Sequence, residues 1–157
     1  MGEFAELENV NVQRGFHRLA SLSPVGPIDQ GARFLTHVGP LDISFYAPGV
    51  VRLRLEARSQ PDYGLLVGEP QYVPVDLASG PGSVRLESDE TSLEVALSPV
   101  RFRLRSGDKV VLESTRDRSF EMVERFSPLA HGPRGWQASL DLQCCEPVFG
   151  LGEKYGG

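Results

Sequence analysis

Apolar and polar residues alternate along residues 93–112, and this stretch carries the clearest strand pattern of the chain. A period of two predicts β-strand, because successive side chains of a strand point to opposite faces of a sheet. The apolar positions are odd-numbered from Leu93 to Leu97 and even-numbered from Val100 onward. We predict one long strand with a bulge at residues 98–99, because the fixed φ of proline is unsuited to the common two-residue hairpin turns.

The same alternation recurs in shorter runs along the rest of the chain. Residues 51–58 form the second clear strand, and a turn at residues 106–109 leads into a short apolar run at 110–112. Further strands are predicted at residues 13–22, 32–37, 41–46, 84–86, 120–126 and 138–142. Prolines and glycines predict turns or loops at residues 23–27, 29–31, 38–40, 47–49, 59–63, 68–82 and 127–135.

Many short strands with turns between them are typical of an antiparallel β-sandwich. No stretch of helical length shows the 3.6-residue apolar spacing of an amphipathic helix. We therefore predict an all-β fold, an antiparallel β-sandwich with little or no helix. Residues 1–12 are expected to be a flexible lead-in, and residues 13–157 a single domain.

Composition narrows the classes of partner. The 157 residues are 40% hydrophobic and 24% charged, as in soluble globular proteins. A formal net charge of −5 argues against nucleic-acid binding, which needs clustered Lys and Arg. No apolar run approaches the roughly 20 residues that span a bilayer, and the acidic start does not resemble a secretory signal. We expect no membrane partner and a cytoplasmic location.

The residues that most often bind metals or act as catalysts form no recognisable motif. Cys144 and Cys145 are neighbours, so a disulfide between them would be strained, and free thiols fit a reducing compartment. His17, His37 and His131 are scattered along the chain. We therefore predict no metal site, no cofactor and no catalytic residue in this chain.

Two rows of arginine alternate with apolar residues on predicted strands. Arg52 and Arg54 form one row, and Arg101, Arg103 and Arg105 form the other. Such rows favour a solvated outer face in which arginine pairs with glutamate. They are equally compatible with a face that contacts another domain.

The end of the chain resembles a segment of glycoside hydrolase family 31. Phe149, Gly150, Gly152, Glu153 and Lys154 match the Phe/Tyr-Gly-x-Gly-Glu-Lys/Arg run that closes the N-terminal domain of that family. Earlier segments also resemble the family's strands, namely residues 50–54 and 84–112, and the likeness extends in order over residues 31–157.

The resemblance implies a galactose-mutarotase-like β-sandwich that packs against a catalytic (β/α)8 barrel. Family members, α-glucosidases and α-xylosidases among them, mostly cleave α-glycosidic bonds with retention, using two aspartates of the barrel. A barrel needs roughly 250 residues, so no catalytic residue is transferred to this chain. The expectation is a non-catalytic module truncated before the barrel of its own polypeptide, with carbohydrate bound only by the parent enzyme.

In this interpretation, Gly150 and Gly152 allow close backbone packing, and Glu153 and Lys154 contact the barrel. An apolar patch is expected near residues 149–155, where the barrel docks.

Two alternatives remain. A free-standing carbohydrate-binding module needs an exposed aromatic platform, for which Tyr46, Tyr63, Tyr72 and Trp136 are the candidates. A mutarotase-like isomerase needs a histidine and a carboxylate on the concave face, for which His37 and Glu153 are the candidates.

Overall fold

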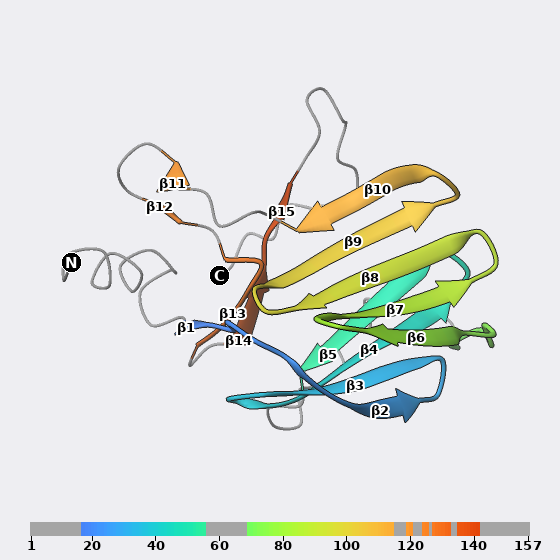
Figure 1. The fold of residues 1–157 in the computed structure, drawn as a ribbon, viewed down its shortest axis with the longest axis horizontal. Coiled ribbons are helices and arrows are strands. Elements are labelled where there is room, and N and C mark those ends of the chain that lie inside the picture. The colour runs from blue at the N-terminus through green and yellow to red at the C-terminus, as the bar shows by residue number, and fades with distance from the viewer. Residues whose placement is uncertain are drawn as a thin grey trace, which may run out of the picture.

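The computed structural model describes residues 17–55, 69–114, 119–120, 124–125, 127–132 and 135–141. These residues contain strands and turns but no helix, and every strand pair is antiparallel (Figure 1). Within this part of the chain, no helix has the length and apolar character needed to cross a membrane. The predicted all-β, antiparallel fold is confirmed. The expected lead-in at residues 1–12 lies outside the described residues.

Two larger sheets form the layers of the sandwich, and two smaller sheets complete the described fold. The six-stranded sheet has the order β15-β10-β9-β8-β7-β6, with strands Leu140–Asp141, Lys109–Ser114, Val100–Ser106, Thr91–Leu97, Ser83–Ser88 and Asp76–Gly80. The four-stranded sheet has the order β2-β3-β4-β5, with strands Ser23–Ile28, Gly31–Thr36, Gly39–Ala47 and Val50–Leu55. The smaller sheets are β1-β13-β14 (His17–Arg18, Leu129–Gly132, Gly135–Ala138) and β11-β12 (Ser119–Phe120, Glu124–Arg125).

The hydrophobic core lies between the inner faces of the two larger sheets. Alternate residues of β3, β4, β7, β8 and the start of β9 point inward and are buried, as the period of two predicts. The four-stranded sheet contributes Ala32, Phe34, Leu41, Ile43, Phe45 and Leu55, and the six-stranded sheet contributes Val84, Leu86, Leu93, Val95, Val100 and Phe102. Leu19, Leu22, Val73 and Leu129 close the core from connecting segments and from β13.

The prediction of one long bulged strand at residues 98–99 is wrong. Leu97 pairs with Val100, so β8 and β9 form a hairpin whose two-residue turn is Ser98-Pro99. Pro99 is the third residue of the four-residue turn 97–100, and the Ser98–Pro99 peptide bond is cis. A cis proline at this position is the feature of a type VI turn. Odd residues of β8 therefore face even residues of β9, and the change of parity keeps both apolar rows on the core side.

Two predicted loops contain strands instead. The turn predicted at residues 23–27 lies in β2, and the loop predicted at residues 68–82 contains β6. Both strands lie at the edge of their sheets, so one side of each strand forms no backbone hydrogen bonds to a neighbouring strand of that sheet. Pro24 and Pro27 are tolerated in β2 for this reason, and the pairing with β3 shifts register between Pro24 and Gly26.

The C-terminal third also differs from the sequence prediction. The loop predicted at residues 127–135 contains β13, which is the centre of the three-stranded sheet. The single strand predicted at residues 120–126 is instead the β11-β12 pair, in which Phe120 lies opposite Glu124. Within the described residues, only His17–Arg18 of the strand predicted at residues 13–22 forms a strand.

Gly31 is required by the close approach of β3 and β4. A Cβ atom built on Gly31 would lie 2.1 Å from the Ile43 carbonyl oxygen and 2.6 Å from the Ser44 Cα. Both neighbours are backbone atoms of the paired strand, so a side chain could fit only if the strands separated. Glycine permits this contact because it has no Cβ.

Candidate functional site

The sequence motif that carries the resemblance lies outside the described residues. This applies to Phe149, Gly150, Gly152, Glu153 and Lys154. It also applies to the two adjacent cysteines and to Tyr63, at positions 144, 145 and 63. The roles predicted for these residues remain predictions. The candidate surfaces below are built from the described residues alone.

No titratable side chain is among the buried residues in the described part of the chain. The buried polar residues there are serines, namely Ser88, Ser114, Ser127 and Ser139. The Ser114 hydroxyl accepts a hydrogen bond from the backbone N–H of Phe102 at 2.9 Å, and the Ser127 hydroxyl donates to the carbonyl of Leu129 at 2.9 Å. Ser114 and Ser127 thus satisfy backbone groups next to an apolar core.

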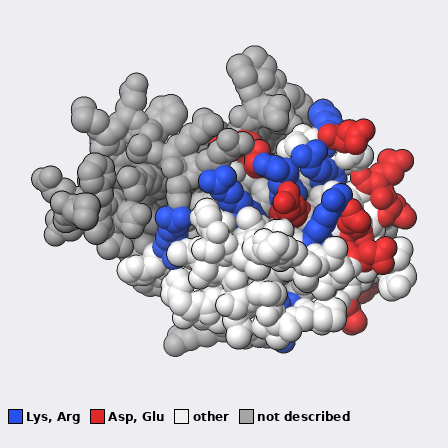
Figure 2. All heavy atoms as spheres, in the orientation of Figure 1, with Lys and Arg blue, Asp and Glu red and all other residues white. Residues whose placement is uncertain are grey.

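Charged side chains lie instead on the outer face of the six-stranded sheet. One residue from each of five neighbouring strands falls in a single cross-strand row, which we call the charge row. It consists of Arg85, Glu94, Arg103, Glu113 and Asp141. Figure 2 shows this face, with blue and red side chains interleaved across it.

Arg103 is the central residue of the charge row. Its Nη2 lies 2.7 Å from Glu113 Oε1, and its Nη1 lies 3.6 Å from Glu94 Oε2. The hydrogen bond from Arg103 to Glu113 is the main reason that the pKa of Arg103 is raised above its ordinary value, and attraction to both carboxylates adds to it. The predicted pairing of this arginine row with glutamate is confirmed at Arg103.

On the outer face of the four-stranded sheet, a carboxylate lies between arginines, the reverse of the arrangement around Arg103. Asp42 accepts two hydrogen bonds from Arg33, at 2.6 Å from Nε and 2.8 Å from Nη2. Hydrogen bonding to Arg33 is the main reason that the pKa of Asp42 is lowered. Burial of the carboxylate raises this pKa, and attraction to Arg33 and Arg54 lowers it further. Arg52 points outward, as predicted, and its guanidinium carbon lies 5.9 Å from the ring centroid of Tyr46, within cation–π range.

Acidic residues gather at one end of the six-stranded sheet. The β7–β8 and β9–β10 turns and the start of β6 line an open depression there. Figure 2 shows acidic side chains, in red, gathered at the right of this face. Its carboxylates are Asp76, Glu87, Asp89, Glu90 and Asp108. They are spread along the rim, and no group of three or more metal-binding side chains exists among the described residues.

His37, the histidine proposed for a mutarotase-like site, does not lie on an inner face of the sandwich. His37 is exposed in the turn between β3 and β4, where the Thr36 hydroxyl accepts from two backbone N–H groups and donates to the Gly39 carbonyl. It therefore does not face the interior of the sandwich. His17 and His131 are far apart along the chain, but the fold makes them direct partners in the pairing of β1 with β13.

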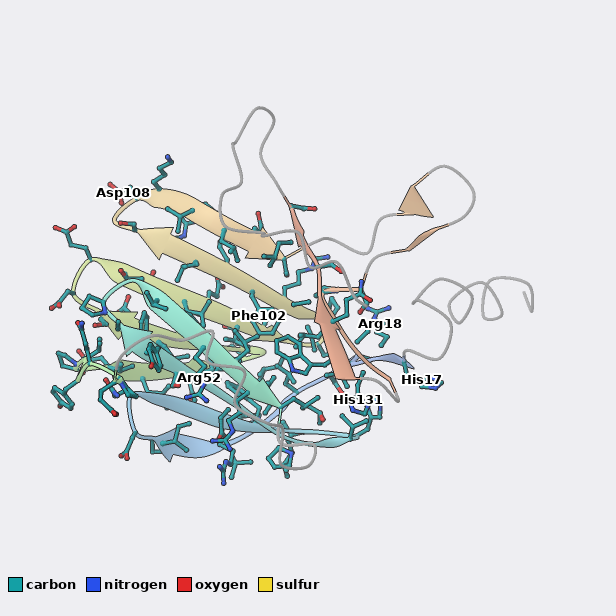
Figure 3. The ribbon with its side chains drawn as sticks, turned by 180° about the vertical axis from the view of Figure 1, so that it is seen from behind. His17, Arg18, Arg52, Phe102, Asp108 and His131 are labelled. Carbon is teal, nitrogen blue, oxygen red and sulfur yellow. The ribbon has the colours of Figure 1, made fainter. Side chains whose placement is uncertain are left out.

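The next residue of that row is Trp136, which pairs with His131 across β13 and β14. Figure 3 shows His17 and His131 at the same end of the molecule, on the small sheet. Sequence reasoning missed this pair because the two strands are far apart in the chain and each is too short to show a periodic pattern. A reliable prediction of the β1–β13 pairing would have been needed to find it.

The candidate aromatic platform is divided between sheets. Tyr46 is half-buried on the four-stranded sheet beneath Arg52, whereas Trp136 is 37% exposed on the three-stranded sheet. Tyr72 is 84% exposed, next to Gln71, whose N–H donates to the Tyr46 carbonyl at 2.9 Å. Tyr72 is thus the most accessible of the described candidates.

Comparison with known proteins gives one match. The family model of the glycosyl hydrolase 31 N-terminal galactose mutarotase-like domain matches residues 40–157. No curated protein and no solved structure matches the chain.

Proposed function

We propose, from the premise that this chain belongs to the family of glycosyl hydrolase 31 N-terminal galactose mutarotase-like domains, that it is a non-catalytic module of a retaining α-glycosidase. The module would pack against the catalytic barrel of the parent enzyme and frame one side of its active site. The parent would act in carbohydrate metabolism as an α-glucosidase-like hydrolase.

The observation that supports a non-catalytic role is the composition of the sandwich interior. A retaining glycosidase needs two carboxyl groups about 5–5.5 Å apart on either side of the scissile bond. Among the described residues, the buried polar side chains are four serines, two of which hydrogen-bond to the backbone, and no carboxylate is buried. The cavity chemistry that such an enzyme requires would therefore come from the barrel.

The proposed contact to the barrel is the motif of Phe149, Gly150, Gly152, Glu153 and Lys154. A glutamate next to a lysine offers one donor and one acceptor group to a neighbouring domain. The flanking glycines would let the two backbones approach closely. A catalytic barrel needs roughly 250 residues, more than the 157 residues of this chain, so in this proposal the parent enzyme supplies the barrel.

The test compares this chain with the polypeptide translated from the extended coding region. Hydrolysis of 4-nitrophenyl α-D-glucoside is measured for both, and the configuration of the first sugar released is read by NMR. We expect activity with retention for the extended protein and none for the 157-residue chain. Hydrolysis by the 157-residue chain itself would contradict the proposal.

The contact motif is tested in the same extended protein. Glu153→Ala should lower the melting temperature of the barrel or the activity, because a domain contact is lost. Glu90→Ala, in the exposed β7–β8 turn, is the matched control and should change neither. Equal behaviour of the two variants would remove Glu153 from the proposed contact.

A second candidate function is carbohydrate binding by the isolated chain, which the exposure of Tyr72 favours. NMR titration with maltose and isomaltose distinguishes it from a purely structural role. Saturable shifts centred on Tyr72 or Trp136 that disappear in Tyr72→Ala or Trp136→Ala would support a binding module. No shift at millimolar sugar would leave the structural role.

A further inference from the structure

We propose that His17 and His131 form a two-histidine binding site for a divalent transition-metal ion on the three-stranded sheet. The inference is independent of the proposed function, since it rests on strand register. His17 lies directly opposite His131 in the antiparallel pairing of β1 and β13. Directly opposite residues point to the same face of the sheet.

The spacing of such a pair suits one metal ion. Cβ atoms of directly opposite residues are about 4.5–5.5 Å apart, and a metal ion lies about 2.0–2.1 Å from each imidazole nitrogen. Rotation about the side-chain bonds of two histidines can therefore bring a nitrogen of each ring to a shared ion. His17 is exposed and His131 is partly exposed, so both rings are accessible from solvent.

The donor set indicates the class of ion. Imidazole favours Cu²⁺, Ni²⁺ and Zn²⁺ over Mg²⁺ and Ca²⁺, and Cu²⁺ binds most tightly in this series. No third histidine, cysteine or carboxylate completes a cluster among the described residues. Water or an added ligand would fill the other coordination positions, as in an open rather than a closed metal site.

Bound metal would join two strands that are distant in the sequence. β1 is two residues long and pairs with β13, and the N–H of the following residue, Leu19, donates to the Leu129 carbonyl at 2.9 Å. An ion held by both histidines cross-links this strand to the centre of the small sheet. Because the unfolded chain does not hold the two histidines together, binding stabilises the folded state.

Trp136 makes the site directly measurable. It is the only tryptophan of the chain and lies beside His131 in the same cross-strand row. Cu²⁺ quenches the fluorescence of a nearby indole, so one fluorophore reports on one site. The titration adds CuCl2 at neutral pH to a chain carrying Cys144→Ser and Cys145→Ser, because thiolates also bind copper.

We expect saturable quenching at one Cu²⁺ per chain. Loss of an outer hydrogen-bond partner of a metal ligand already costs about 10–100-fold in affinity, so His17→Ala and His131→Ala should each weaken binding at least about tenfold. His37→Ala, in the β3–β4 turn, is the matched control and should bind as the parent does. Circular dichroism confirms that each variant is folded.

A second measurement distinguishes a specific site from loose surface binding. Ni²⁺ should raise the melting temperature of the parent and of His37→Ala, and leave that of His17→Ala unchanged. Equal quenching and equal melting shifts in all variants would show an adventitious ion only and overturn the proposal. Quenching that depends on His131 but not on His17 would also overturn the two-histidine site.

Discussion

The two sheets of the sandwich have similar inner faces and opposite outer faces. Between the sheets, both contribute buried aliphatic and aromatic residues at every second position. Outside, the six-stranded sheet has a cation, Arg103, between the carboxylates of Glu94 and Glu113. The four-stranded sheet has a carboxylate, Asp42, hydrogen-bonded to Arg33 and attracted by Arg54.

This difference separates the residues that determine the fold from those that determine the surface. The alternation of apolar residues is enough to place both sheets against one core. The intervening residues are free to carry either sign of charge. Asp42 is 20% exposed and has a bidentate partner, whereas Arg103 is 35% exposed and shares its charge between two glutamates. Asp42 should therefore contribute more to stability than Arg103 does.

The largest losses of stability should come from substitutions on the inner faces, and the losses should be similar for the two sheets. Phe34→Ala in the four-stranded sheet should lower the free energy of unfolding by about 3–5 kcal/mol, and Leu86→Ala in the six-stranded sheet by about 2–5 kcal/mol. Both side chains are fully buried, so each substitution leaves a cavity. Urea unfolding provides the measurement, and Val25→Ala, at a residue 57% exposed, is the control. A loss in only one sheet would show that the two layers do not unfold together.

The next effect concerns the backbone contact of β3 with β4. Gly31→Ala should cost about 1–3 kcal/mol, because the new methyl group meets the Ile43 carbonyl and forces a shift of the strands. Gly80→Ala on the edge strand β6 is the control, since its Cβ has no neighbour closer than 3.8 Å. Thermal melting compares the two variants. Similar melting temperatures would mean that β3 and β4 separate without cost.

A smaller effect is expected at Asp42. Asp42→Asn should cost about 1 kcal/mol at neutral pH, because a charge-assisted pair with Arg33 is lost. The folded-state pKa of Asp42 is lowered by Arg33, so the stabilisation is present above the unfolded-state pKa and is lost as pH falls through the folded-state pKa. Urea unfolding from neutral to strongly acidic pH should show the parent and the variant converging in acid. A constant difference would contradict the role of the carboxylate charge.

The smallest effect is expected on the charge row. Arg103→Gln should cost about 0.5–1 kcal/mol, and added NaCl should reduce the difference because the pairs are near the surface. Arg85→Gln at the more exposed end of the row should change stability by less than about 0.5 kcal/mol. If Arg103→Gln cost more than Asp42→Asn, the ranking of the two outer faces would be reversed.

The fold class could be predicted from the sequence because alternation is a local signal. The buried positions of β4 and β8 follow directly from it. The sequence does not predict the hairpin at Ser98-Pro99, because a switch of the apolar positions from odd to even numbers fits either a bulge or a two-residue turn. The rule that common two-residue turns need positive φ argues against proline and therefore against the hairpin. The edge strands β2 and β6 were missed because proline and glycine predict loops whether or not a neighbouring strand is present.

The surfaces were less predictable than the fold. That the arginine rows face outward followed from the period of two, but the partners depend on strand order: Glu94 and Glu113 meet Arg103 only because β8 and β10 flank β9. The pairing of His17 with His131 depends on a contact between distant segments. Such contacts are set by the whole fold, and a single sequence has no local pattern that reveals them.

The prolines of β2 have a consequence for how molecules of this protein meet in solution. An exposed sheet edge can be extended by a strand from another molecule, which needs a row of free backbone donors. Pro24 and Pro27 supply no N–H, and the register shift beside Gly26 interrupts the row between them. The β2 edge of the four-stranded sheet therefore resists strand-by-strand growth into larger aggregates, even where Val25 leaves apolar surface exposed.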